Sequence, residues 1–326
     1  MEENENVNVT QEEPPVITPE AVRAEIKRTR HKAEHFCYVL SIVSGIFVVI
    51  YYMIKFFQDG GILENLGEML ADSNIPASSP AFYTIAVAIL GIVSIAGGIG
   101  AVIFFVLVQL YAYYKMYAND MSYSIRVTEK NYPEIYEKVQ EYTRLLGWKK
   151  APEVYVQQMN GDINAYTSWV PGKVYVHLNA EIVDLLYLHG DLDTISFVMA
   201  HEFGHAYLHH VQIYYNVWTV FCAFIPFFGK KIISPLLGRA REFSADRVAQ
   251  ALTGGKAELR TMMFMAAGRH GYLRTDAEDY MLWINKNHNF LEKIARFITN
   301  LFADHPIMPF RTAAIMDKNK KSGRLI

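Results

Sequence analysis

Two long apolar blocks near the N-terminus most strongly constrain what this chain can fold into. Residues 36–57 contain one charge, Lys55, and residues 81–114 contain none. About 20 apolar residues suffice for a helix to cross a bilayer. The first block fits one crossing, whereas the second is too long for one upright helix and too short for two helices and a turn. We expect two transmembrane helices, the second bending at Gly97 and Gly98 and continuing into the next domain.

Composition agrees with a membrane protein and argues against a nucleic-acid partner. Hydrophobic residues make up 52% of the 326-residue chain, which exceeds the need of one soluble core, and the excess lies in a few long blocks. The formal net charge of −2 shows no basic excess that would indicate a nucleic-acid partner. Cys37 and Cys222 lie in apolar stretches without a spacing motif, so we expect buried thiols rather than a disulfide.

Charges around the first block predict which side of the membrane the rest of the chain occupies. Basic residues precede this block, whereas residues 58–80 carry four acidic residues and no Lys or Arg. Positive charge favours the cytosolic side, so we expect residues 1–35 in the cytosol as a disordered, basic segment, residues 58–80 as an extracytoplasmic loop, and residues 115–326 in the cytosol. A hairpin at residues 81–114 would instead place the last domain outside. The basic residues are Arg23, Lys27, Arg28, Arg30 and Lys32.

The domain after the second block is expected to be mainly α-helical with a small β-sheet. A helical pattern runs over residues 132–147 and ends at a glycine. Three short β-rich runs follow, and a Pro-Gly turn joins the last two. The strands are predicted at residues 153–158, 163–168 and 173–178, and further helices at residues 179–187, 191–210, 238–252, 257–268, 277–287 and 290–302.

The run His201-Glu202-Phe203-Gly204-His205 is the main chemical signal of this domain. Imidazoles four residues apart on a helix lie on one face, close enough to bind one metal ion. The pattern H-E-x-x-H supplies two zinc ligands and a carboxylate that can act as general base in hydrolysis. Alone, the pattern is a modest signal for a hydrolytic zinc site.

A catalytic zinc site needs a third protein ligand, and Glu242 is the best candidate. His209 is two helical turns from His201, so these side chains cannot converge on one ion. Glu242 lies on a separate predicted helix, and Asp246 follows one turn later on the same face, suited to orienting a ligand imidazole through a hydrogen bond. The alternative is that both carboxylates face solvent and pair with Arg241 and Arg247.

HEFGH followed by REFSADRVA resembles the HtpX-like family of integral-membrane zinc metallopeptidases, which are related to the CAAX prenyl protease. Further similar segments occur in the family's order, and together they cover about residues 132–316. They are Tyr132-Pro133-Glu134, Ala151-Pro152-Glu153-Val154-Tyr155, Asn164-Ala165, and His305-Pro306 with Arg311.

This resemblance implies a zincin-like fold and a role for each matching residue. One Zn²⁺ per chain would be bound by His201, His205 and Glu242. Glu202 would be the general base, and His305 would contact substrate and stabilise the oxyanion. Asp246 is implied to orient a zinc ligand, and Arg311 is expected to hold the His305 segment.

Asn164, Ala165 and Tyr166 are expected on an edge strand beside the cleft. Substrate backbone would pair with this strand, which gives affinity with little sequence preference. The alternative is a strand that only borders the sheet. Thr167, Ser168 and Trp169 depart from the small residues and glycine common in the family, so we do not carry over the substrate selectivity of relatives.

The apolar residues 211–237 between the two motifs are too few for two membrane crossings. Because the two motifs must share one metal ion, the number of crossings between them must be even, and we therefore expect none. We predict a hairpin that dips into the bilayer surface with Trp218 and Tyr214 or Tyr215 at the interface. A buried core helix is the alternative.

These observations predict a multi-pass protein, expected in a bacterial cell membrane, with a zinc endopeptidase domain in the cytosol. By resemblance, its substrates would be polypeptides, chiefly misfolded or unassembled membrane proteins. The alternatives are a selective processing protease of the CAAX type and a non-catalytic membrane adaptor that retains the fold. The sequence does not indicate an oligomeric state.

Overall fold

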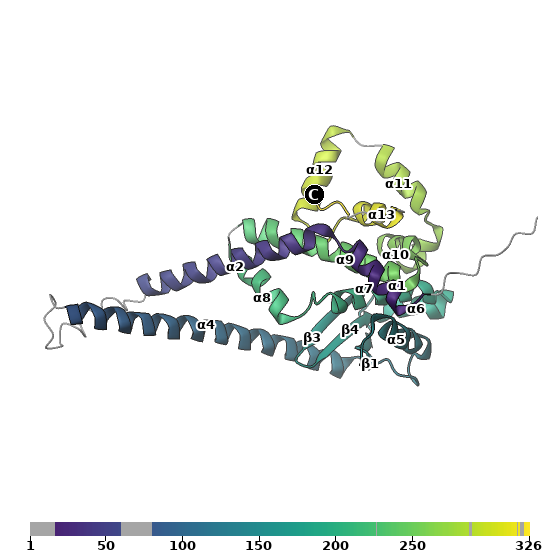
Figure 1. The fold of residues 1–326 in the computed structure, drawn as a ribbon. Coiled ribbons are helices and arrows are strands. Elements are labelled where there is room, and N and C mark those ends of the chain that lie inside the picture. The colour runs from purple at the N-terminus through teal and green to yellow at the C-terminus, as the bar shows by residue number, and fades with distance from the viewer. Residues whose placement is uncertain (1–16, 60–79, 226, 287–288, 318, 320–322) are drawn as a thin grey trace, which may run out of the picture.

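In the computed structural model, two long helices, α2 and α4, extend from a mostly helical domain that contains a small sheet (Figure 1). The structure describes residues 17–59, 80–225, 227–286, 289–317, 319 and 323–326. Residues 1–16 of the predicted disordered segment and residues 60–79, most of the predicted extracytoplasmic loop, lie outside the described residues.

The N-terminal arm differs from the prediction, because residues 19–29 form a helix instead of a disordered segment. Helix α1 (Pro19–Thr29) begins with Thr18, whose side chain accepts a hydrogen bond from Ala21 N, and Pro19 occupies its first turn. Val22 and Ile26 are one turn apart and buried, and α1 packs on α5 and α9. The basic residues are therefore presented on a folded helix rather than on a flexible tail.

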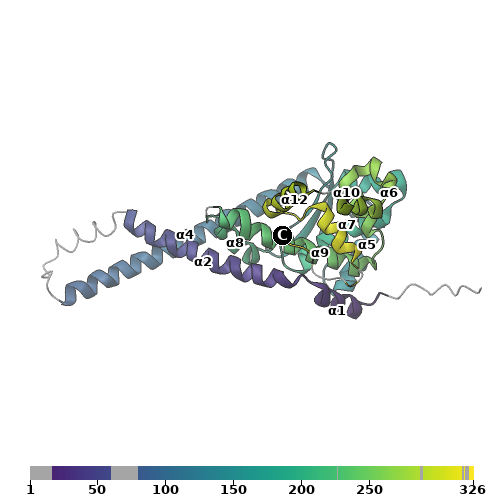
Figure 2. The ribbon, with the colours of Figure 1, turned by 90° about the horizontal axis from the view of Figure 1, so that it is seen from above.

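Helix α2 (Lys32–Asp59) contains the first apolar block. Among the described residues, Lys32–Lys55 is the one helix long and apolar enough to cross a membrane. The second block lies in helix α4 (Pro80–Tyr123), which runs as a single helix into the domain, so the hairpin alternative is wrong. Because most side chains of residues 80–102 lie outside the description, the second span stays a prediction. Both helices leave the domain on the same side (Figure 2).

A four-stranded mixed sheet with the order β1-β2-β4-β3 forms the base of the domain. Strand β3 is antiparallel to β4, and Gly172, in the left-handed region, makes the turn that joins them. Helix α4 packs against one face of the sheet and α7 against the other. The strands are β1 (Ile125–Arg126), β2 (Glu153–Gln157), β3 (Ala165–Val170) and β4 (Lys173–Asn179). Three were predicted, and β3 begins two residues later than expected.

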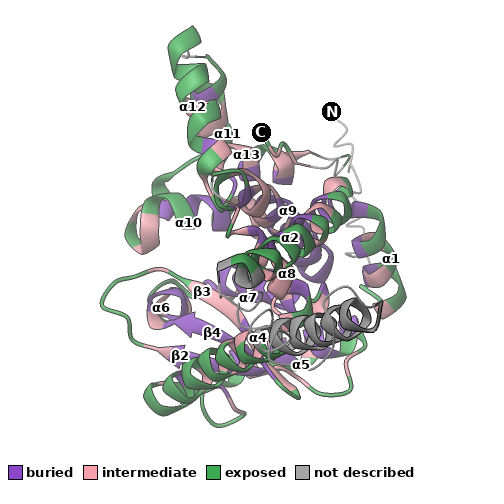
Figure 3. Cartoon of the chain, turned by 90° about the vertical axis from the view of Figure 1, so that its left-hand side faces the viewer, coloured by how far each residue is buried: buried purple, intermediate pink, exposed green. Residues whose placement is uncertain are grey.

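Helix α7 (Leu192–Tyr207) is the central, nearly fully buried helix of the core. It contacts α5 (Pro133–Leu146), α6 (Ala180–His189), the sheet and α9 (Ser234–Thr253). Figure 3 shows buried residues concentrated in this region. The helix ends at Tyr207, three residues earlier than predicted, because His209 adopts a left-handed conformation and the chain turns back.

Residues 211–237, for which we predicted a hairpin at the bilayer surface, contain two helical segments that contact each other. Helix α8 (Ile213–Cys222) is followed by a π-helical segment, η1 (Gly229–Ile233), and both pack against α2. Tyr215 and Cys222 are buried, whereas Phe224, Phe227 and Phe228 near the apex are exposed. The hairpin therefore joins a protein-packed base to an apolar tip, and its insertion into a bilayer stays a prediction.

The C-terminal part consists of short helices above α7 and α9 (Figure 1). Helices α11 and α12 agree with the prediction, whereas α13, which follows the His305 loop, was not predicted. The elements are α10 (Glu258–Gly271), η2 (Tyr272–Arg274), α11 (Ala277–Lys286), α12 (Phe290–Phe302) and α13 (Met308–Met316).

Candidate metal centre

Helix α7 places two imidazoles side by side on its surface. Asp191 caps the helix by accepting a hydrogen bond from Thr194 N. One turn separates His201 from His205, and their Nε2 atoms are 3.2 Å apart. This is the arrangement expected from the four-residue spacing.

Gly204 brings α9 close enough to α7 to complete the group. A Cβ atom at position 204 would lie 3.0 Å from Ala245 Cα and 3.0 Å from Val248 Cβ, which is closer than ordinary van der Waals contact. The absence of a side chain on α7 therefore permits backbone-to-backbone packing with α9. This packing places Glu242 beside the imidazoles.

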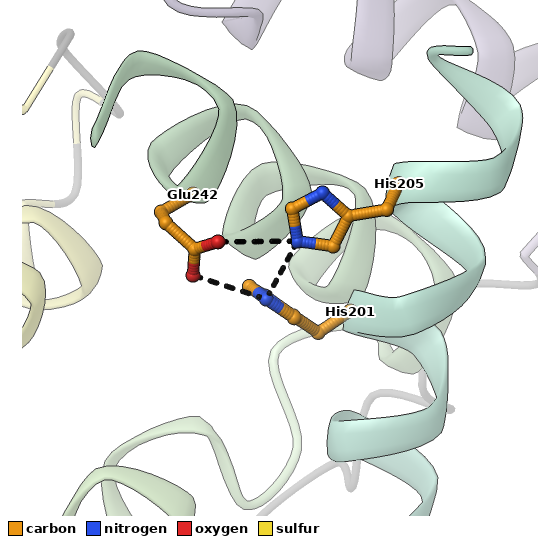
Figure 4. A group of neighbouring side chains, drawn as sticks. All are labelled: His201, His205 and Glu242. Atoms are coloured by element: carbon orange, nitrogen blue, oxygen red, sulfur yellow. Dashed lines mark hydrogen bonds and ion pairs between the residues drawn. The ribbon is translucent and has the colours of Figure 1, made fainter. Parts of the chain in front are cut away.

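His201, His205 and Glu242 converge on one point (Figure 4). Glu242 Oε2 lies 3.4 Å from His201 Nε2, and Glu242 Oε1 lies 3.3 Å from His205 Nε2. The three potential ligand atoms all lie within 4.8 Å of one another. These three residues, called the metal group below, provide two imidazoles and one carboxylate. This donor set suits a catalytic zinc ion with an open coordination position.

The Nδ1 atoms of both imidazoles face away from this point and are already engaged. His201 Nδ1 lies 2.8 Å from Asp246 Oδ1, and His205 Nδ1 lies 3.0 Å from His210 Nδ1. A carboxylate only accepts hydrogen bonds, so His201 Nδ1 carries a proton and donates it to Asp246. Such partners fix the ring orientation and leave Nε2 available as a ligand. The residues therefore fit the predicted metal ion.

The electrostatics favour a positive charge at the point of convergence. Burial disfavours the imidazolium form of His201, but hydrogen bonds to Asp246 and Glu242 outweigh it and raise its pKa to about 10. Burial also opposes ionisation of Glu242, yet its contacts with His201 and His205 hold its pKa well below the usual range. The site thus attracts a cation, either a proton on His201 or a divalent metal ion.

Asp246 and Arg311 form a buried ion pair behind the imidazole of His201. Arg311 donates to both carboxylate oxygens, at 3.0 and 2.6 Å. Burial opposes the charge on both residues, but the pair lowers the pKa of Asp246 and raises the pKa of Arg311. Arg311 Nη1 also lies 3.8 Å from Glu242 Oε2, so this guanidinium adjoins two of the predicted site carboxylates.

Thr167 contacts Glu202, the predicted general base. The sequence had not indicated a contact between these two residues. Thr167 Oγ1 on β3 lies 2.8 Å from Glu202 Oε2 and 2.8 Å from Glu202 O. The hydroxyl has one proton and donates to one of these acceptors at a time. The edge strand thereby restrains the side chain of the base.

His305 lies beside the group on an exposed loop. Its Nε2 atom is 3.6 Å from Glu242 Oε1, and its side chain is 71% exposed. The loop is held by the first turns of α9. Arg239 donates to the carbonyls of Leu301 and Ala303, and a Cβ atom at Gly238 would lie 2.7 Å from Asp304 O. Close packing of α9 therefore positions the loop.

A cavity of about 250 Å³ opens over the metal group. Strand β3 borders it, and one edge of β3 pairs with β4 while none of the described strands pairs with the other edge. The predicted substrate-binding residues Asn164, Ala165 and Tyr166 line the cavity together with Glu202 and His305. An edge strand therefore adjoins the cleft as predicted, and substrate pairing with it stays a prediction.

Besides Thr167, the structure adds His210 and Glu34 to the site. His210 Nε2 lies 3.0 Å from Glu34 Oε1, and both side chains are buried. Burial lowers the pKa of His210 to about 3 despite the adjacent carboxylate. On a continuous helix, positions 205 and 210 would point in different directions. The turn at His209 brings them together, and periodicity could not predict this.

Residues 129–319, more than half of the chain, match the model of one protein family, described as peptidase family M48. The matched region contains the three converging residues, Glu202 and His305. Comparisons with curated proteins and with solved structures gave no significant match.

Proposed function

The chain belongs to peptidase family M48, and on that premise we propose that it is a membrane-anchored, zinc-dependent endopeptidase. M48 membership indicates a metallopeptidase. The metal, the internal cleavage of polypeptides and the membrane setting are our proposals.

The convergence of His201, His205 and Glu242 beside Glu202 carries the proposal. Glu242 follows His205 by 37 positions and His201 by 41, and it lies on a different helix. The ligand atoms of the three residues nevertheless lie within 4.8 Å of one another. A non-catalytic adaptor would need neither this convergence nor a base beside it. The retained geometry therefore favours the enzyme over the adaptor.

The chain's residues suit hydrolysis of a peptide bond. A zinc ion, when bound, supplies Lewis acidity that lowers the pKa of water and polarises a carbonyl group. Glu202 accepts the proton of the attacking water and returns it to the leaving amine. His305 donates a hydrogen bond to the oxyanion that develops on the substrate carbonyl, a contact that can contribute about 3 kcal/mol.

Strand β3 supports a substrate that binds in extended form. Main-chain pairing with an edge strand gives affinity with little dependence on sequence. This suits an enzyme that cleaves unfolded segments of many proteins. We propose that misfolded or unassembled membrane proteins are the substrates, and that cleavage takes place in their cytosolic segments.

The arrangement of α2 and α4 supports the membrane setting. Helix α2 is apolar enough to cross a bilayer, and its first residues pack on α9 next to the metal group. Helix α4 ends in the same domain. We propose that both cross the membrane and that the domain lies in the cytosol, as the basic residues before α2 indicate.

The proposal is tested by comparing the wild-type chain with Glu202→Gln in detergent. Both proteins are assayed for cleavage of casein and of a misfolded membrane protein, and their zinc content is measured. We expect the variant to keep one zinc per chain and to lose at least 100-fold in activity, because the base is absent while the proposed ligands remain. Asp193→Asn, an exposed acidic residue at the start of α7, serves as control.

Equal proteolysis by wild type and Glu202→Gln would contradict the mechanism. Inactivity of both proteins with zinc bound would favour the adaptor. Cleavage of one defined C-terminal sequence, with casein left intact, would favour the processing protease.

A further inference from the structure

Helix α12 (Phe290–Phe302) is amphipathic, but its apolar side faces outward. Phe290 and Leu291 are 76% and 73% exposed, and the apolar side chains of the following turns, such as Phe297 and Ile298, are exposed as well. Asn300, on the polar side, is 0% exposed. This is the reverse of a helix that covers a soluble core.

Hydrogen bonds from the polar side of α12 to neighbouring segments hold the helix in this orientation. Asn300 donates to Leu325 O and accepts from Ile307 N, at 2.9 and 3.2 Å. Arg296 donates to Ile284 O. Asn289 and Glu292 form a capping box at the start of the helix. Rotating the helix to bury its apolar side would break the bonds of Asn300 and Arg296.

The outward apolar side of α12 is continuous with the exposed surface of α2, the helix that is apolar enough to cross a membrane. The rings of Phe302 and Phe227 are 6.2 Å apart, which joins α12 to the tip of the α8–η1 hairpin. At the same tip, Phe224 contacts Tyr52 of α2, with ring centroids 6.3 Å apart. Phe224, Phe227 and Tyr52 are all exposed. Figure 3, viewed from the side toward which α2 and α4 extend, shows α12 exposed along most of its length.

We propose that α12 lies in the bilayer interface, with its apolar side inserted among lipid acyl chains beside α2. An amphipathic helix of this kind binds at the boundary between headgroups and acyl chains. The inference rests on the proposed membrane anchoring by α2. Because α12 ends three residues before His305, its lipid contact holds the mouth of the cleft at the membrane surface.

The experiment measures the lipid exposure of α12 in the full chain after reconstitution into vesicles of phosphatidylethanolamine and phosphatidylglycerol. Single cysteines replace Leu291 and Ile298 on the apolar side and Lys293 on the polar flank, in a background in which Cys37 and Cys222 are alanine. Each is spin-labelled, and its collisions with oxygen, which concentrates in lipid, and with a water-soluble nickel chelate are measured. Val43→Cys on α2 is the lipid reference.

We expect labels at positions 291 and 298 to collide mainly with oxygen, as at position 43, and a label at position 293 to collide mainly with nickel. Water exposure at 291 and 298 with lipid exposure at 43 would overturn the inference and leave the anchoring intact. Water exposure at position 43 would overturn the anchoring itself. Dipolar coupling between labels at position 291 would show a second copy on this surface and would also overturn the inference.

A separate observation concerns the second imidazole of the metal group. Glu34, at the start of α2, is fully buried and accepts hydrogen bonds from Tyr215 and Ser244 as well as from His210. Since a carboxylate can only accept, His210 Nε2 carries a proton. His210 Nδ1 lies 3.0 Å from His205 Nδ1, so this contact connects the carboxylate of Glu34 to the side of the His205 ring opposite its ligand atom Nε2.

We infer that Glu34 is a positioning residue for the metal site, acting through His210 on His205. Helix α2 thereby contributes a residue to the metal site. Glu34 acts on His205 through His210, just as Asp246 acts directly on His201. Partners of ligand imidazoles typically contribute 10- to 100-fold to metal affinity.

Zinc affinity of the detergent-solubilised full chain, measured by competition with a chelator, tests this inference. We expect Glu34→Gln and His210→Ala each to weaken zinc binding about 10-fold or more. Ser41→Ala, a buried change elsewhere on α2, should leave the affinity unchanged, and thermal unfolding of the metal-free proteins checks their folding. Wild-type affinity in both folded variants would overturn the inference, whereas a wild type without zinc would contradict the proposed function.

Discussion

At the residue scale, the sequence predicts side chains whose positions follow from helical spacing. His201 and His205 lie one turn apart on one helix, and Glu242 and Asp246 lie one turn apart on another. The structure brings all four side chains together. Thr167, His210 and Glu34 were not predicted for the site. Their contacts depend on the register of β3, on a left-handed turn at His209 and on the docking of α2, and none of these has a local sequence signal.

Thr167 gives a test at this scale. Thr167→Val keeps the side-chain shape but removes the hydroxyl that donates to Glu202. Hydrogen bonds to charged groups contribute about 1.5–3 kcal/mol, so we expect kcat to fall about tenfold or more. KM and zinc content should change little. Steady-state kinetics with a quenched fluorescent peptide measure the effect.

Thr167→Ser is the matched control, because it retains the hydroxyl and should keep most of the activity. An unchanged kcat in Thr167→Val would show that this contact does not position the base.

At the scale of elements, periodicity predicts most helices but not how they face one another. The boundaries of α11 and α12 agree with the sequence, yet the outward orientation of the apolar side of α12 depends on the tertiary contacts of Asn300 and Arg296. Helix α1 lies in residues 1–35, which were expected to be disordered. It is helical because Val22 and Ile26 are buried between α5 and α9.

The close packing of α7 and α9 predicts a strong effect of Gly204→Ala. The added methyl group would lie 3.0 Å from Ala245 Cα and would push the helices apart. Overpacking of this kind costs about 1–3 kcal/mol of stability. We expect a lower unfolding temperature by calorimetry and weaker zinc binding, because Glu242 moves away from the imidazoles.

Gly100→Ala on α4 is the control, since a Cβ atom there meets nothing within 4 Å. Its unfolding temperature should match that of the wild type. Wild-type zinc affinity in Gly204→Ala would argue against the role of helix packing in placing Glu242.

At the scale of the whole molecule, the metal group lies where the first apolar helix joins the domain. Helices α1 and α2 contact α9, and Glu34 connects α2 to the imidazole of His205 through His210. Residues predicted to be a tail, an anchor and an enzyme domain are thus packed together. A sequence divided into successive segments could not show these contacts between distant residues.

The proposed orientation predicts how cysteines respond to a membrane-impermeant reagent in intact cells, in the background lacking Cys37 and Cys222. Lys256→Cys, on the exposed loop before α10, should be protected until the membrane is permeabilised. Glu64→Cys, in the predicted extracytoplasmic loop, should be labelled at once. The reverse pattern would place the peptidase domain outside the cytosol.

Metal analysis of the purified full chain tests the central claim most directly. Zinc per chain is determined by plasma mass spectrometry for the wild type and for His205→Ala, with His209→Ala, one turn further along the chain, as the matched control. We predict one zinc per chain in the wild type and in His209→Ala, and less than one tenth of that in folded His205→Ala, which should also lack proteolytic activity. Stoichiometric zinc in His205→Ala would contradict the assignment of this metal site.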